Sequence, residues 1–146
     1  MDEAGVDDTL NYAYGWSARG QRCAGERLGH RTQRVSMVAA WCAGQVLAPV
    51  TFEGYCDSAL IEAWCAQQLV PTLRPGQVLI LDNASFHRQT QLRTLLAQAG
   101  CWLLPLPAYS PDLNQIEPLW HTLKSRIAHA LPQYATLRAA VDAAFL

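Results

Sequence analysis

The chain is poor in charge: only 16% of its 146 residues are Asp, Glu, Lys or Arg, whereas 51% are apolar. This composition excludes disordered, collagen-like and coiled-coil classes and predicts a folded globular protein. Internal repeats and low-complexity segments are lacking too, which excludes repeat architectures. A length of 146 residues suits one domain, so we expect a single domain over residues 1–146.

Long hydrophobic runs are also lacking. The longest unbroken apolar run, from Met37 to Gly44, is much shorter than the roughly 20 residues that span a bilayer. Met1 is followed by Asp2 and Glu3, where a secretory signal would carry basic residues. We therefore expect no membrane insertion and no secretion, and we predict a cytoplasmic protein.

The cysteines lack the spacing of a disulfide framework or a metal site. The five cysteines are odd in number and include no C-x-x-C pair. A disulfide framework and a structural zinc cluster are therefore excluded. We expect reduced and mostly buried cysteines.

An excess of positive charge is missing, since 11 basic residues face 12 acidic ones and the net charge is −1. This balance argues against a polyanion partner such as DNA. The charges are nevertheless segregated, with four carboxylates in residues 2–8 and five arginines in residues 19–34, which include Arg19 and Arg22. These arginines either form a solvated surface or contact DNA. A nucleotide-binding loop is excluded, because Gln21-Arg22 replaces the Lys-Ser/Thr that it requires.

Hydrophobic patterning predicts a hairpin followed by alternating strands and helices. The expected strands cover residues 33–41, 45–52, 78–81 and 101–106, with a shorter extended piece around 12–16. The expected helices begin after an Asp57 N-cap, at Arg88, near Asn114 and at Thr136. We expect the third and fourth strands to be buried on both faces. The order predicts an α/β sandwich with a mixed sheet, in which a site lies at strand ends beside a crossover.

Two segments contain the candidate catalytic residues. In residues 79–87, LILDNASFH, a strand ends at Asp82 and is followed by Asn83 and His87. In residues 106–124, LPAYSPDLNQIEPLWHTLK, Glu117 lies near the start of the long helix, and 34 residues separate it from Asp82. Together these segments resemble the DDE transposase family, in particular the insertion-sequence-630 and mariner-like superfamily.

The resemblance extends to the start of the chain, because Asp2-Glu3 is similar to the first aspartate of the family and the Glu that follows it. It implies a ribonuclease-H-like fold, a mixed sheet flanked by helices. It also implies that Asp2, Asp82 and Glu117 form a catalytic triad that binds two Mg²⁺ or Mn²⁺ ions. In the family this aspartate normally ends the first strand, so we expect that strand to be truncated here.

The chemistry of phosphodiester cleavage explains why carboxylates are needed. Two divalent ions activate the attacking group and stabilise the leaving oxygen, and oxygen ligands suit Mg²⁺ and Mn²⁺. Two carboxylates about 4 Å apart repel each other by about 4 kcal/mol at an effective dielectric constant of 20, so a carboxylate cluster predicts cations.

Helical geometry predicts where Glu117 lies. The apolar positions of its helix share one stripe, formed by Ile116, Leu119, Trp120, Leu123 and Ile127. Glu117 and Lys124 lie at the border of that stripe. There Glu117 can face Asp82, and Lys124 can contact a DNA phosphate.

Simpler interpretations of the three acids stay open. Asp82 can be a turn-forming aspartate at a strand end. Asn114-x-x-Glu117 can be a capping pair. Asp7 or Asp8 can replace Asp2 in another register.

The other polar residues are interpreted mainly as supporting ones. Asn83 fixes a turn, His87 caps the next helix, and Asn114 supports the site. His121 is interpreted as a solvated helical residue in preference to a metal ligand. DNA contacts are expected from Arg19, Arg22, Tyr109 and Lys124, whereas Trp41, Trp64, Trp102 and Trp120 are expected to pack in the core.

The leading hypothesis is the catalytic domain of a DDE transposase that acts on double-stranded DNA. The resemblance implies cleavage at transposon ends, strand transfer into TA targets, a homodimer in the synaptic complex and a nucleoid-associated protein. The helix-turn-helix region of the family is not recognisable in this sequence. Two alternatives are an inactive remnant of a decayed or frameshifted element, acting at most as an interaction module, and a general metal-dependent nuclease.

Overall fold

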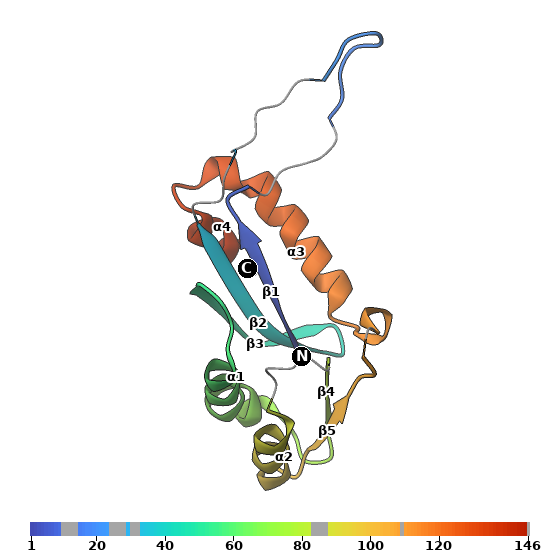
Figure 1. The fold of residues 1–146 in the computed structure, drawn as a ribbon, viewed down its shortest axis with the longest axis vertical. Helices are drawn as coiled ribbons and strands as arrows, with labels where there is room; N and C mark the ends of the chain where they lie inside the picture. The colour runs from blue at the N-terminus through green and yellow to red at the C-terminus, as the bar shows by residue number, and fades with distance from the viewer. Residues whose placement is uncertain (10–14, 24–28, 30–32, 83–87, 109, 146) are drawn as a thin grey trace.

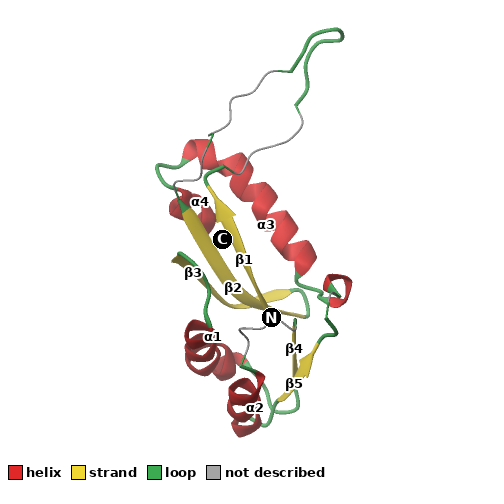
Figure 2. Ribbon diagram, viewed as in Figure 1, coloured by secondary structure: helices red, strands yellow, loops and turns green. Residues whose placement is uncertain are grey.

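A computed structural model describes residues 1–9, 15–23, 29, 33–82, 88–108 and 110–145. The strands are β1 (Asp2–Asp7), β2 (Arg34–Cys42), β3 (Gln45–Glu53), β4 (Val78–Leu81) and β5 (Trp102–Pro105). The α-helices are α1 (Ser58–Trp64), α2 (Gln89–Gln98), α3 (Glu117–Ala130) and α4 (Leu137–Ala144). Short helical turns extend them: η1 (Cys65–Leu69) and η2 (Val70–Thr72) after α1, η3 (Pro111–Leu113) before α3, and η4 (Leu131–Gln133) after it. Helices lie on both sides of the strands (Figures 1 and 2), which confirms the α/β prediction.

The first sheet has the order β1-β2-β3, and both of its pairings are antiparallel. A tight turn joins β2 to β3, because Ala43 and Gly44 both adopt a positive φ, as a two-residue hairpin requires. The hairpin predicted from the sequence is therefore confirmed.

The first strand begins at Asp2 instead of ending there, which corrects the expected position of this strand. All six residues of β1 pair with β2, from Asp2 opposite Ala39 to Asp7 opposite Arg34. Ala4 and Val6 alternate with more polar residues along β1, and they pack against the core on the side of α3 and α4. This alternation is the reason why the carboxylate-rich segment is a strand.

A second, parallel sheet pairs β4 with β5, with Val78 opposite Trp102. The two sheets meet at the start of β1, where the amino group of Met1 donates a 2.6 Å hydrogen bond to the carbonyl oxygen of Ile80. Antiparallel and parallel pairings thus occur side by side, and the start of β1 lies next to β4.

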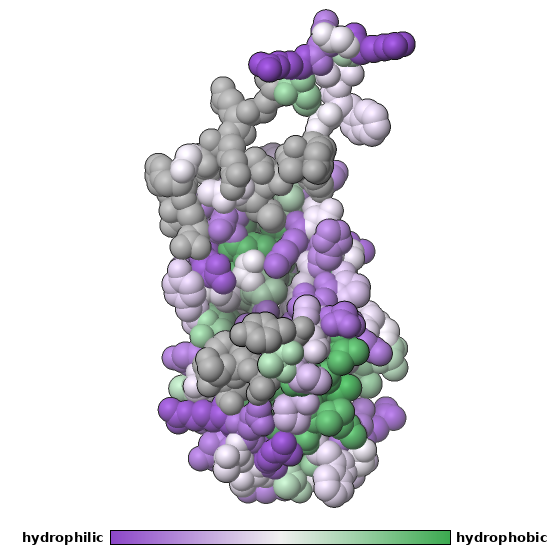
Figure 3. All heavy atoms as spheres, turned by 45° about the vertical axis from the view of Figure 1, so that its right-hand side comes forward, coloured by the Kyte–Doolittle hydropathy of each residue, from purple (hydrophilic) through white to green (hydrophobic). Residues whose placement is uncertain are grey.

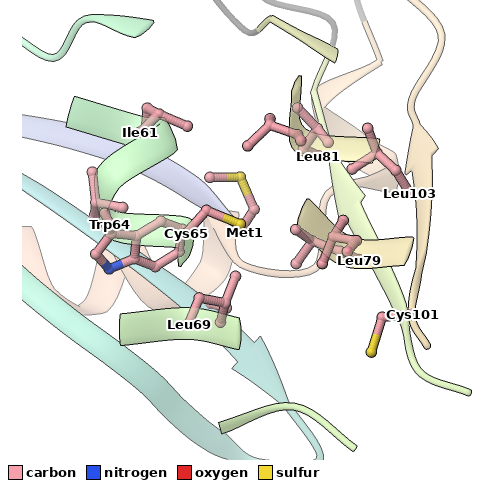
Figure 4. Packing of buried hydrophobic residues seen from close by; sticks show 13 residues of the cluster. Met1, Ile61, Trp64, Cys65, Leu69, Leu79, Leu81, Cys101 and Leu103 are labelled. Atoms are coloured by element: carbon pink, nitrogen blue, oxygen red, sulfur yellow. The ribbon is translucent and has the colours of Figure 1, made fainter. Parts of the chain in front are cut away.

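Two hydrophobic cores lie on opposite faces of β2. Val38 and Ala40 face the first core, in which α1, η1 and α2 pack against Met1 and the inner residues of β4 and β5 (Figure 4). Met37 and Ala39 face the second core, with α3 and α4. Because successive side chains of a strand point to opposite faces, β2 is buried on both sides.

The expectation that β4 and β5 are buried on both faces is wrong. Leu79 and Leu81 are buried, whereas the alternate residues of the two strands are exposed: Val78, Ile80, Trp102 and Leu104. These side chains form an apolar patch over β4 and β5 (Figure 3). The buried residues of α2 and η1 pack against one face, while α3 and α4 pack against the first sheet. Trp102 is therefore not a core residue.

The described cysteines are all free thiols, and two of the five, Cys65 and Cys101, are buried. Burial raises the pKa of the Cys65 thiol to about 11. None of the described helices is long and apolar enough to cross a membrane.

Candidate active site

The carboxylate of Asp2 is buried and held by hydrogen bonds from distant parts of the chain. Its Oδ2 accepts one hydrogen bond from Asn114 Nδ2 at 2.9 Å and another from Trp120 Nε1 at 3.3 Å. Its Oδ1 accepts the backbone N–H of Glu3 at 2.8 Å. The first residue of β1 is thereby fixed to α3 and to the segment before it.

The segment before α3 brings Asn114 to Asp2. Asn114 ends the η3 turn, its N–H donates to the carbonyl of Pro111, and its own carbonyl accepts the N–H of Glu117 at 3.1 Å. Its side-chain amide donates instead to Asp2, and among the described residues no side chain caps α3. The capping-pair interpretation of Asn114 and Glu117 is therefore wrong. Helix α3 begins at Glu117, later than predicted, and Pro118 occupies its first turn, where a missing N–H is tolerated.

Burial raises the pKa of the Asp2 carboxyl to about 7. Repulsion from Glu3, Asp82 and Glu117 adds to this rise, and the hydrogen bond from the Glu3 N–H opposes it. Asp82 and Glu117 therefore lie within electrostatic reach of Asp2. Three carboxylates that the sequence separates by up to 115 positions meet in one region.

The other two acids are more accessible. Asp82 follows β4 and is half-buried, and Glu117 is exposed at the start of α3. Beside Glu117 the surface has a hollow of about 580 Å³. Its lining residues are Pro111, Asp112, Asn114, Gln115, Glu117, Pro118 and His121.

The donor set suits a hard divalent cation. Carboxylate oxygens are the ligands that Mg²⁺ and Mn²⁺ prefer, and the three described donors to Asp2 are all neutral. A buried carboxylate next to two others calls for a cation. Among the described residues, however, no three His, Cys, Asp or Glu side chains lie close enough together to hold one ion. The three carboxylates are therefore chemically suitable ligands for a divalent cation. In this structure they lie farther apart than direct coordination of one ion requires.

The alternative acids lie away from this region. Asp7 is at the other end of β1, and its Oδ1 accepts the N–H of Thr9 at 3.0 Å. Asp8 Oδ2 accepts the N–H of Gln33 at 3.1 Å. Both carboxylates hold the turn after β1, so they do not replace Asp2.

The remaining predicted residues fall into three groups. Lys124 is half-buried and His121 exposed, both on α3. Arg19 and Arg22 are exposed in residues 15–23, which lie beyond the end of β1 opposite to Asp2 (Figure 1). Asn83, His87 and Tyr109 are outside the described residues.

Trp120 has a contact that the sequence analysis missed. It was predicted as core packing, and it is indeed buried, but its indole N–H points to Asp2. Its position one helical turn after Glu117, on the buried stripe, was the available signal.

The fold defines a class of protein. Helices lie on both sides of the strands, as in the ribonuclease-H-like cores of integrases and transposases. The chain belongs to the DDE superfamily endonucleases, because the model of that family matches residues 1–138.

Solved structures agree on the fold. The Mos1 strand transfer complex has a TM-score of 0.60 at 19% identity over 82% of this chain, and the pre-cleavage Mos1 transpososome 0.56 at 14% over 99%. The catalytic core of BIV integrase has a TM-score of 0.52 at 15% identity, covering 77% of this chain and 72% of the integrase core. The chain spans 39% and 55% of the two Mos1 chains. No curated protein sequence matches it.

Proposed function

We propose that residues 1–146 form the catalytic domain of a DNA transposase, which cleaves phosphodiester bonds at the ends of a mobile element and joins them to target DNA. One observation carries this proposal: the buried Asp2 carboxylate, held by neutral donors from α3 and the segment before it, lies within electrostatic reach of Asp82 and Glu117. Membership of the DDE superfamily endonucleases supports it.

Asp2, Asp82 and Glu117 would hold two Mg²⁺ or Mn²⁺ ions. Such ions activate the attacking oxygen and stabilise the leaving oxygen of an in-line displacement. The protein contributes the fixed orientation of Asp2, set by Asn114 and Trp120, and the two more accessible carboxylates that face solvent and substrate.

DNA contacts are assigned to Lys124, Arg19, Arg22 and Tyr109, with Asn83 and His87 as supporting residues. Lys124 lies about two turns after Glu117 on α3, on the same edge of the helix, where an ammonium group can bind a phosphate. We further propose a TA dinucleotide as the target, a homodimer on paired ends as the active form, and a location in the cytoplasm at the nucleoid.

The test of cleavage uses the full chain and supercoiled plasmid DNA. We expect nicking that requires Mn²⁺ or Mg²⁺ and is lost in Asp82→Asn and Glu117→Gln. Asp112→Asn, an exposed acid in the turn before α3, is the matched control and should nick normally. Nicking that persists in Asp82→Asn, or that survives chelation, would overturn the proposal.

Target choice needs a separate assay. An oligonucleotide that carries an end of the mobile element is incubated with plasmid, and the joints are sequenced. Joints confined to TA support strand transfer by a transposase. Joints at random sequence would point to a different target rule.

One observation favours the alternative of a folded but inactive remnant: the described acids do not approach closely enough for three of them to coordinate one ion. Calorimetric titration with Mn²⁺ separates the two functions. Binding that is lost in Asp82→Asn supports the enzyme, and no binding by the unmodified chain supports the remnant.

A further inference from the structure

We propose that Trp120 is a positioning residue, whose indole N–H fixes the Asp2 carboxylate relative to Glu117. The inference rests on the proposed function, because it assigns Asp2 and Glu117 to the same metal centre. Trp120 itself touches neither metal nor DNA in this assignment. It acts through Asp2.

The indole of Trp120 occupies a lone pair on one oxygen of the Asp2 carboxylate. A carboxylate oxygen has two in-plane lone pairs, and Oδ2 of Asp2 already receives two donors, the amide of Asn114 and the indole of Trp120. Oδ1 receives one described donor, the N–H of Glu3. The hydrogen bonds therefore leave Oδ1 as the oxygen available to a cation, and they select a single-oxygen mode of binding.

The hydrogen bond from Trp120 to Asp2 also holds the helix that carries Glu117. Trp120 is 2% exposed and lies three residues after Glu117, one turn along the same helix. A helix held at this turn cannot slide or rotate without breaking the hydrogen bond to Asp2. Together with the amide of Asn114, the indole thereby fixes Asp2 relative to the turn of α3 that carries Glu117.

A second buried tryptophan provides the matched control. Trp64 in α1 is 4% exposed, and its Nε1 donates a 2.8 Å hydrogen bond to the backbone carbonyl of Ala48. Trp64→Phe and Trp120→Phe each remove one buried indole N–H and keep an aromatic ring. Only Trp120→Phe removes a donor from a carboxylate of the site.

The experiment is a calorimetric Mn²⁺ titration of the unmodified chain and the two variants, with each folded fraction measured by urea unfolding. We expect Trp120→Phe to weaken Mn²⁺ binding about tenfold, since a lost hydrogen bond to a metal ligand has effects of this size. Trp64→Phe should bind Mn²⁺ within twofold of the unmodified chain. Equal affinities in all three chains, or equal losses in both variants, would overturn the inference.

A spectroscopic readout does not depend on metal binding. The indole N–H signal of Trp120, assigned by its loss in Trp120→Phe, should shift in Asp2→Ala, while the signal of Trp64 stays in place and reports an intact fold. A Trp120 signal that is unchanged in Asp2→Ala would refute the contact. If the unmodified chain binds no Mn²⁺ although this signal shifts, the proposed function fails and the hydrogen bond stands.

Discussion

The side-chain amide of Asn114 donates a 2.9 Å hydrogen bond to Oδ2 of Asp2 across 112 positions of sequence. Both residues are buried, so neither polar group can turn to bulk water if the other is lost. This contact fixes the start of β1 to the segment that precedes α3. Several consequences can be measured.

Removing the amide should destabilise the fold. Asn114→Ala leaves a buried carboxylate with one donor fewer, and we expect a loss of about 1–3 kcal/mol in the free energy of unfolding. Asn114→Asp should cost more above pH 7, because two buried carboxylates then face each other. Urea unfolding measures both, with the exposed Gln115→Ala as control. A loss in Asn114→Ala no larger than in the control would contradict the role of the contact.

Stability should fall as the pH rises from about 4 to about 7. The folded protein holds the Asp2 proton up to a pKa of about 7, whereas the unfolded chain releases it near 3.8. The folded state therefore binds more protons in this window, and the contribution is complete below pH 3.8 and lost above pH 7. It is on the order of 4 kcal/mol. Urea unfolding at a series of pH values should show a shallower decline for Asp2→Asn. Parallel curves would show that Asp2 is not the group responsible.

Glu117→Gln should separate stability from metal binding. Glu117 is exposed at the start of α3, so its charge contributes at most about 1 kcal/mol through the helix dipole. Mn²⁺ should raise the melting temperature of the unmodified chain and raise that of Glu117→Gln much less. Asp112→Asn serves as the control with one exposed acid fewer. Equal stabilisation of all three chains by Mn²⁺ would remove Glu117 from the site.

Gly5→Ala should disturb the opposite face of β1. A methyl group at Gly5 would overlap the guanidinium group of Arg34, which lies 5.0 Å from the centre of the Tyr55 ring. Displacing it forfeits a cation–π contact, and we expect a cost of about 1 kcal/mol in urea unfolding. Gly29→Ala is the control, since no atom of the residues that the structure describes lies within 4 Å of a methyl group there. The two variants should differ, and equal stabilities would show that Arg34 moves aside freely.

Local patterns predicted most of the elements. The Ala43-Gly44 turn and the Asp57 N-cap each depend on residues that are close in the chain, and each is found where it was expected. The last helix was predicted to begin at Thr136, and Thr136 is its N-cap. The family resemblance likewise identified the fold class. Local chemistry and a long motif suffice for these features.

Features that depend on distant neighbours were predicted less well. The runs 78–81 and 101–106 are apolar throughout, and nothing in them shows that one face lacks a covering helix. The indole of Trp120 looked like packing, because its hydrogen-bond acceptor lies 118 positions away. The capping interpretation of Asn114 failed for the same reason. The partner of a polar group is a property of the tertiary fold.

The long separation between Asp2 and its partners also sets an order of events in folding. Asp2 precedes its two side-chain donors in the chain by 112 and 118 residues. Closing so long a loop costs chain entropy that local hairpins do not pay, so β1 can join β2 well before α3 arrives. Until then the carboxylate stays hydrated and ionised. The acidic centre is therefore complete only once Asn114 and Trp120 have reached the start of β1.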